Sequence, residues 1–290
     1  MDLIIQGTLN GLSYGMILFL IGSGLSLIMG VMQILNLAHG AMFMLGGYLG
    51  WTLAVHLGLD FWASALVAGL GIALVGLALE RLILRRMHGR LDNQVLATLG
   101  VTYIVTNSVI WIWGAEPKVP FVPGLLEGSV DLFGQKYPAS RLGVLVVGAV
   151  IAALLWWLQD RTRIGSIVRA GMDDPQTAQS LGINVGKISA IMFAIGSFVA
   201  GVSGVLGQQL MGLRPDQGMN ILVLALVVLV IGGIGTIQGA LLGASVIGLI
   251  SAFGQILFPE IASFLIFGAM VIVLAIWPHG ILGRSNAIRI

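Results

Sequence analysis

The stretch that decides the fold runs from Leu3 to Leu59 without a single Asp, Glu, Lys or Arg, and its middle reads N-L-A-H-G from Asn36 to Gly40. A second charge-free stretch runs from Gln217 to Pro259 and is interrupted by G-G-I-G-T-I-Q-G from Gly232 to Gly239. A helix needs about 20 apolar residues to span a bilayer. Each stretch is therefore long enough for two crossings, or for one crossing and a re-entrant pair.

The composition is that of an integral membrane protein. Of the 290 residues, 58% are hydrophobic and 9% are charged, whereas soluble domains carry about 25% charged residues. The apolar runs are long and rich in Leu and Ala, which favours helices over a barrel, whose strands alternate over about 10 residues. The formal net charge is only +2 and the basic residues are spread over loops, which favours an orientation signal over nucleic-acid binding.

Two further features of the sequence limit the kind of protein that this chain can be. The chain has no cysteine, which excludes disulfides, thiolate chemistry and cysteine-based metal sites. The start, Met1-Asp2-Leu3, has no basic segment and no small-residue cleavage site, so we expect the first hydrophobic run to stay in the mature protein.

The apolar runs predict an all-α, polytopic bundle that forms a single transmembrane domain over residues 1–290. We expect nine spans, or eight to ten if the interrupted stretches hold broken or re-entrant helices. The runs cover residues 5–29, 33–56, 60–84, 93–114, 141–158, 187–211, 219–234, 238–257 and 261–278.

Basic residues predict the orientation, because short cytoplasmic loops are enriched in Lys and Arg. One cluster follows the third span, and a second lies around the loop of residues 160–187; their members are Arg81, Arg85, Arg86, Arg90, Arg161, Arg163, Arg169 and Lys187. Both loops are therefore predicted to be cytoplasmic, and the loop of residues 115–140 external. Arg284 and Arg289 place the C-terminus inside the cell, and an odd number of spans then places the N-terminus outside.

The first interruption carries Asn36, His39 and Gly40. A break at membrane depth persists only inside protein or beside a water-filled cavity, so the interruption predicts a cavity. Asn36 is expected to cap a half-helix that begins at Leu37, with His39 in its first turn and Gly40 allowing close approach. The positive end of such a half-helix attracts substrate carboxylates. In the alternative interpretation, His39 and Asn36 are packing residues that fix the break.

The second interruption supplies Thr236 as a cap, with Gly235 before it and Gln238 after it. The pattern H-G-A at His39 is repeated as Q-G-A at Gln238, at the corresponding place in the two charge-free stretches. Such an echo is typical of transporters built from repeats, whether parallel or inverted. We therefore add these residues to the candidate pathway.

A polar stripe marks the span of residues 93–114, where Gln94, Thr98, Thr102 and Thr106 recur every four residues on one helical face. The stripe could line a polar pathway. Equally, the threonines could donate to backbone carbonyls within the bundle.

The cytoplasmic loop predicts a short helix of about two turns. Asp174 is a capping residue, Pro175 suits the first helical position, and Gly182 lies just beyond the end. The alternative is a helix that merely lies at the membrane interface. The candidate residues of this helix and its flanks are Arg169, Asp174, Pro175, Ala178, Leu181, Gly182 and Ile183.

Three motifs together point to a family. L-N-L-A-H-G-A-M begins at Leu35, R-A-G-M-D-D-P-Q-T-A-Q-S-L-G-I-N-V begins at Arg169, and G-G-I-G-T-I-Q-G-A begins at Gly232. Taken together they resemble the permeases of branched-chain amino acid ABC importers, specifically the LivH-like subunit, over nearly the whole chain.

That resemblance implies a bacterial inner-membrane permease that pairs with a LivM-like permease, two ATPase subunits and a periplasmic substrate-binding protein. It also implies that the short cytoplasmic helix is the coupling helix that docks on an ATPase, with Gly182 matching the glycine of the family's loop. The chain departs from the fullest form of that loop, because Arg169-Ala170-Gly171 stands where a glutamate would begin it.

The expected function is transport, and no enzymatic activity is expected. The sequence has no G-x-x-x-x-G-K-[ST] phosphate loop, so ATP would act through partner ATPases and no cofactor would be bound directly. Alternatives are a permease for urea, short amides or aromatic acids, a stand-alone secondary transporter or facilitator, and a purely structural subunit. The candidate pathway residues are Asn36, His39, Gly40, Thr98, Thr102, Gly235, Thr236 and Gln238.

Overall fold

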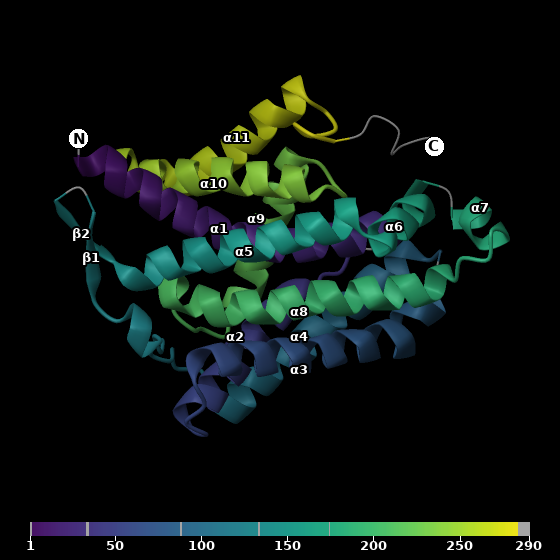
Figure 1. Ribbon diagram of the computed structural model, residues 1–290, viewed down its shortest axis with the longest axis horizontal. Helices are drawn as coiled ribbons and strands as arrows, with labels where there is room; N and C mark the ends of the chain where they lie inside the picture. The colour runs from purple at the N-terminus through teal and green to yellow at the C-terminus, as the bar shows by residue number, and fades with distance from the viewer. Residues whose placement is uncertain (1, 33–34, 88, 133, 174, 284–290) are drawn as a thin grey trace.

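The computed structural model describes residues 2–32, 35–87, 89–132, 134–173 and 175–283, and most of them lie in helices (Figure 1). In this described part, nine apolar helices follow the nine predicted runs. They are α1 (Asp2–Met32), α2 (His39–Val55), α3 (Phe61–Leu82), α4 (Leu91–Trp113), α5 (Ala139–Arg161), α8 (Val185–Met211), α9 (Gln217–Gly232), α10 (Ile237–Leu257) and α11 (Ala262–Ile276).

Two of these helices, α2 and α9, fall short of a crossing. Among the described residues, seven helical segments are long and apolar enough to cross a membrane, one of them being α11 together with the 3₁₀ turn before it (Pro259–Ile276), while α2 has 17 residues and α9 has 16. At 1.5 Å per residue these two helices are about 24–26 Å long, less than the hydrocarbon thickness of about 30 Å. The prediction of an all-α membrane bundle with broken helices is confirmed.

The connections add smaller elements. Two polar helices, α6 (Arg163–Asp173) and α7 (Pro175–Ser180), join α5 to α8, and α6 was not predicted. The loop between α4 and α5 holds an unpredicted antiparallel hairpin of β1 (Ser129–Leu132) and β2 (Gln135–Pro138). Short 3₁₀ turns cover Leu84–Met87, Gly124–Leu126 and Pro259–Ile261.

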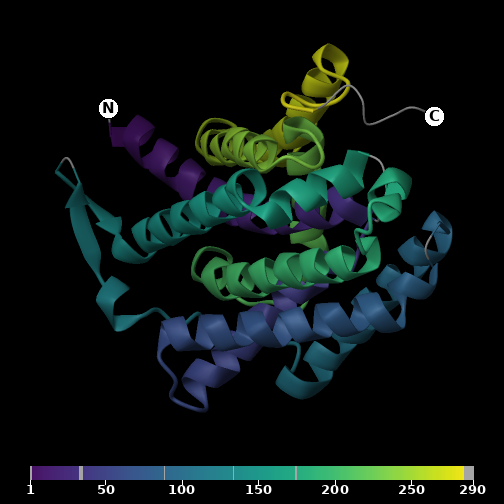
Figure 2. The ribbon, with the colours of Figure 1, turned by 45° about the vertical axis from the view of Figure 1, so that its right-hand side comes forward.

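The hairpin and the polar helices lie at opposite ends of the bundle (Figures 1 and 2). The start of α1 lies at the hairpin end, where the Tyr137 hydroxyl is 3.2 Å from Ser13 Oγ and 3.2 Å from Asn10 Oδ1. At the other end Arg85 lies beside Gly186, so the two basic loops meet. This arrangement agrees with the prediction that both loops face the same side.

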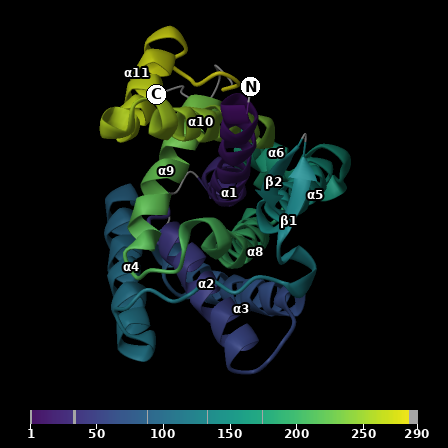
Figure 3. The same cartoon turned by 90° about the vertical axis from the view of Figure 1, so that its left-hand side faces the viewer.

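The centre of the bundle is formed by α1 and α8 (Figure 3). Helix α1 packs on α10, α8, α5 and α9, while α8 packs on α3 and α2. Glycines bring these helices close: a Cβ at Gly24 would lie 2.8 Å from the Gly196 carbonyl oxygen, and one at Gly201 would lie 3.0 Å from Gly69 Cα. These small residues therefore let the helix backbones approach closely.

Helix α9 joins two groups of helices. Its beginning packs against α2 and its end against α10 and α11, and Figure 3 shows it passing from one group to the other. At the periphery, α4, α5 and α11 expose apolar side chains such as Ile104, Val146 and Phe264, as expected of surfaces that face lipid or another membrane subunit.

Candidate translocation site

The first break lies between α1 and α2 and is built on a turn at Asn36. The N–H of His39 donates to the Asn36 carbonyl at 3.2 Å, and Ala38, with φ −74° and ψ −5°, has the geometry of the third residue of a type I turn. The Asn36 side chain accepts from the N–H of Ala38 at 3.1 Å. The predicted helix start at Leu37 is therefore wrong: Leu37 and Ala38 belong to the turn, Ala38 precedes the helix, and α2 begins at His39.

The His39 ring is enclosed and holds the break against α1. Its Nε2 lies 3.1 Å from the Ile21 carbonyl oxygen, and a Cβ at Gly24 would lie 3.1 Å from the same nitrogen. A carbonyl can only accept, so in a neutral ring Nε2 carries the hydrogen and Nδ1 is an acceptor. The His39 ring therefore fixes the break against α1, as the packing interpretation expects. Its Nδ1 can still accept a hydrogen bond.

Two polar atoms at this break are buried without a hydrogen-bond partner among the described residues. They are Nδ2 of Asn36, a donor, and Nδ1 of His39. Both side chains have no exposed area. Leaving a buried polar group unpaired costs about 1–3 kcal/mol, which makes such a pair unusual unless another molecule uses it.

The threonine stripe of α4 packs on the same break. Thr102 Oγ1 lies 3.1 Å from the Leu37 carbonyl oxygen and 2.9 Å from that of Thr98, and Thr98 Oγ1 lies 2.9 Å from the carbonyl oxygen of Gln94. Both threonines are buried. The threonine hydroxyls thus donate to backbone carbonyls, as the second interpretation expects, and Thr102 joins α4 to the break.

The beginning of α9 meets the beginning of α2. The backbone at Gly40 lies so close to the Gly218 carbonyl oxygen that no Cβ fits between them, and a Cβ at Gly218 would be 3.3 Å from Ala41 Cα. The partial positive ends of two short helices therefore converge near Asn36 and His39. Asp216, just before α9, pairs with Arg214 at 3.0 Å.

Two glutamines at the end of α8 were missed in the sequence analysis. Gln208 is 1% exposed, and within the described residues neither its side chain nor that of Gln209 has a hydrogen-bond partner. An amide pair inside the apolar run of residues 187–211 was the signal that could have identified them. Nowhere in the described chain do three His, Cys, Asp or Glu side chains gather as a metal site would require.

The second break lies between α9 and α10. Thr236 precedes α10, and its Oγ1 accepts from the N–H of Gly239 at 3.2 Å, so the predicted cap is confirmed. Gly235 has φ +85°; its N–H donates to Ser26 Oγ at 3.1 Å and its carbonyl accepts from Gln159 Nε2 at 3.2 Å. The break is thus held between α1 and α5.

The segment after α11 covers the other side of this break. The N–H groups of Ile281 and Leu282 donate to the carbonyls of Ile231 and Gly232 at 2.8 and 3.0 Å. These carbonyls lie in the last turn of α9, where a helix leaves its carbonyls without internal partners. These two carbonyls at the break are therefore paired within the protein, as a membrane requires.

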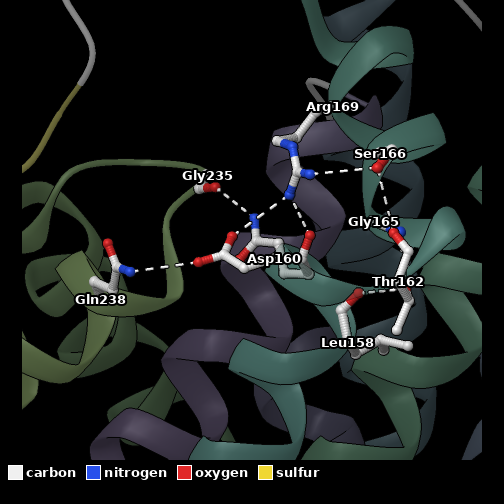
Figure 4. A network of polar contacts seen from close by, with 9 residues as sticks. Leu158, Asp160, Thr162, Gly165, Ser166, Arg169, Gly235 and Gln238 are labelled. Carbon is white, nitrogen blue, oxygen red and sulfur yellow. Dashed lines mark hydrogen bonds and ion pairs between the residues drawn. The ribbon is translucent and has the colours of Figure 1, made fainter.

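A polar network joins the second break to the corner between α5 and α6 (Figure 4). Asp160 Oδ1 lies 3.4 Å from Arg169 Nη1, and its Oδ2 lies 3.5 Å from Gln238 Nε2. Arg169 also donates to the carbonyl of Gln159. Arg169 and Gln238 were predicted from the sequence, whereas Gln159, Asp160 and Ser26 were not, because their partners at the second break lie 76 to 209 positions away.

The predicted pathway residues form two clusters. Asn36, His39, Gly40, Thr98 and Thr102 lie at the first break, and Gly235, Thr236 and Gln238 lie at the second. The segment of α1 from Ile21 to Ser26 contacts both breaks. Gln238 also lines a groove of about 420 Å³, whose other residues are Met16, Ala149, Ala152, Ala153, Trp156, Ile237 and Leu241.

Helix α7 ends in a Schellman motif. The N–H of Ile183 donates to the Ala178 carbonyl at 3.1 Å, that of Gly182 to the Gln179 carbonyl at 2.9 Å, and Gly182 has φ +84°. The predicted stop at Gly182 is confirmed, while Asp174 lies outside the described residues. Pro175 is the first residue of α7, and Arg169 lies on α6 rather than on α7.

The surface of α7 is partly apolar. The Leu181 side chain is 76% exposed, whereas Ala178 is buried. Figure 1 shows α7 projecting from the end of the bundle opposite the hairpin.

Comparisons with known proteins agree with this architecture. A family model described as the permease component of branched-chain amino acid transport systems matches residues 7–274. The high-affinity branched-chain amino acid permease BraD of Pseudomonas aeruginosa is 30% identical over 305 residues, covering 99% of this chain and 98% of BraD. LivH of Escherichia coli K12 is 29% identical, covering 99% of this chain and 97% of LivH.

A second permease type is also similar. LivM of Escherichia coli K12 is 28% identical over 309 residues, covering 97% of this chain and 71% of LivM. Because the family model spans nearly the whole described bundle and its broken helices, this chain belongs to the family of branched-chain amino acid transport permeases.

Proposed function

We propose that this chain is the LivH-like permease subunit of an ATP-driven importer and forms part of the pathway for branched-chain amino acids. It would pair with a LivM-like permease, two ATPase subunits and a periplasmic binding protein in a bacterial inner membrane, with its C-terminus in the cytoplasm. Family membership supports the transport class, and the names of the relatives favour branched-chain amino acids over urea, short amides or aromatic acids.

One structural observation supports a zwitterionic substrate. The first break combines two converging helix N-termini with a buried donor on Asn36 and a buried acceptor on His39. A carboxylate suits the helix ends and the amide donor, and an ammonium group suits an imidazole acceptor. In the proposed cycle this break opens when the ATPases move, and the passing amino acid pairs with both atoms.

Helix α7 is the proposed contact with the ATPase. The Schellman motif fixes the residue at which the helix ends. Directly after the helix, the apolar side chain of Leu181 is exposed. ATP binding would bring the ATPases together and move α7 as a rigid unit.

The substitution Asn36→Ser tests the role of the first break. Serine keeps a capping oxygen but removes Nδ2. ATP-driven uptake of radiolabelled leucine by the complete complex in liposomes is expected to fall about tenfold or more, because a hydrogen bond to a charged group contributes about 1.5–3 kcal/mol.

Asn107→Ser is the matched control, because Asn107 is exposed on α4 and its side chain bonds only its own helix, at the Tyr103 carbonyl. Equal uptake by the two variants would contradict the proposed role of Asn36. Uptake of leucine by this chain alone, without ATP or partners, would instead favour a facilitator.

A further inference from the structure

Gly235 in the second break is held by two helices at once. Its N–H donates to Ser26 Oγ of α1 at 3.1 Å, and its carbonyl accepts from Gln159 Nε2 of α5 at 3.2 Å. Figure 4 shows Gly235 beside Asp160, the next residue of α5. The φ of Gly235, +85°, places it at the sharpest part of the turn into α10. The position of this turn therefore depends on the last residues of α5.

Asp160, the next residue of α5, contacts the helices on either side. One carboxylate oxygen lies 3.4 Å from Arg169 of α6 and the other lies 3.5 Å from Gln238 in the first turn of α10. Arg169 also donates to the carbonyl of Gln159, and its Nη2 lies 3.4 Å from Ser166 Oγ. The end of α5 thus joins the polar arm, formed by α6 and α7, to the beginning of α10.

Packing between α5 and α10 is weak along most of their length. A groove of about 420 Å³ separates them, lined on α5 by Trp156 and by the three alanines Ala149, Ala152 and Ala153. Side chains that face an open groove cannot transmit movement as an interlocked core does. At the end of this groove, the hydrogen bond from Gln238 to Asp160 at 3.5 Å connects the two helices directly.

These contacts can hold the neighbouring helices in position without adding much to the stability of the fold. The side chains of Arg169 and Asp160 are 30% and 40% exposed, and exposed ion pairs add little to folding stability. Directed contacts of this kind can form, shift and re-form during a transport cycle without unfolding the bundle.

Building on the proposed function, we infer that Gln159 and Asp160 are positioning residues that transmit movement of α6 and α7 to the second break. We name the group of Ser26, Gln159, Asp160, Arg169, Gly235 and Gln238 the corner network. When an ATPase moves α7, the corner network moves Gly235 and the start of α10 with it, so that ATP use and substrate passage stay coupled.

The test uses the complete importer in liposomes with radiolabelled leucine, and measures both leucine uptake and ATP hydrolysis. Gln159→Leu and Asp160→Ala are expected to lower the amount of leucine carried per ATP by about fivefold, within the range known for residues that alter coupling between sites. ATP hydrolysis and thermal stability are expected to change little. Asp160→Glu, which keeps the carboxylate, should restore most of the ratio.

Gln255→Leu is the matched control, because Gln255 lies on α10 and its side chain bonds only Ser251 of the same helix, at 3.1 Å. An unchanged ratio in Gln159→Leu and Asp160→Ala would overturn the inference. So would a loss of folding or assembly that fully accounts for the lost uptake.

A distance measurement tests the same inference without altering the corner network. The chain has no cysteine, so spin labels can be placed at Leu181→Cys directly after α7, Ile234→Cys beside Gly235, and Val130→Cys on the hairpin, all exposed positions. On ATP binding, the distance from position 181 to 234 should stay constant while that from 234 to 130 changes. The opposite result would overturn the inference, whereas a wild-type complex that carries no leucine would contradict the proposed function instead.

Discussion

Gly235 is the residue on which the second break depends most directly. With φ +85°, a side chain at this position would meet the steric penalty of the left-handed region, about 1–2 kcal/mol. Gly235→Ala is therefore expected to lower the free energy of unfolding by about that amount, measured by denaturation in detergent.

Gly100→Ala is the control for this prediction. Gly100 lies within α4, and a Cβ there would have no neighbour within 4 Å. Replacing glycine by alanine inside a helix gains up to about 1 kcal/mol, so this variant should be as stable as the original or more so. Equal destabilisation by both substitutions would contradict the assigned role of Gly235.

Some site residues could be predicted because their chemistry acts locally. Thr236 caps the helix that begins right after it, and Gly182 ends the helix right before it. The contact between Gln159 and Gly235 could not be predicted, since 76 positions separate them and only the folded bundle brings them together.

At the scale of the elements, the nine apolar helices and the polar helix α7 agree with the sequence predictions, whereas the polar helix α6 was not predicted. Apolar runs near membrane length have few alternative structures, because the bilayer requires every backbone group to be paired. Helix α6 was not predicted although its signals are local: Thr162 caps it through the N–H of Gly165 at 3.1 Å, and Ile164, Ile167 and Val168 recur at helical spacing in the sequence. Its bond to α5 through Arg169 appears only in the folded chain. Helix α2 begins at His39 rather than at the predicted Leu37, because the hydrogen bonds of the turn at Asn36 replace those of a first helical turn.

Helix α7 carries a prediction of its own. Burying a leucine in an interface contributes about 1.5–3 kcal/mol, so Leu181→Asp should weaken binding of the ATPase subunits about tenfold or more. Binding can be measured by titrating purified ATPase onto the permease pair in nanodiscs.

Leu125→Asp serves as the comparison, because Leu125 is 89% exposed in the loop at the opposite end of the bundle. That variant should bind ATPase normally. Equal binding by Leu181→Asp would show that α7 is not the docking helix.

At the scale of the whole molecule, the two ends of the bundle are expected to face different compartments. In spheroplasts, a membrane-impermeant maleimide should label Leu125→Cys at once, and should label Leu181→Cys only after permeabilisation. The original chain has no cysteine, so the label has no background site within it. Labelling of both positions in sealed cells would contradict the proposed orientation.

The bonds from Ile281 and Leu282 to the end of α9 carry a consequence for biosynthesis. Their donors are made fifty positions after the carbonyls at residues 231 and 232 that they pair with. Since a polypeptide emerges from its N-terminus onward, α9 and α10 must enter the membrane while those two carbonyls still lack these partners. The insertion machinery or trapped water must shield those two carbonyls until residues 281 and 282 have been made and inserted, and a ribosome stalled before residue 281 would leave them unpaired.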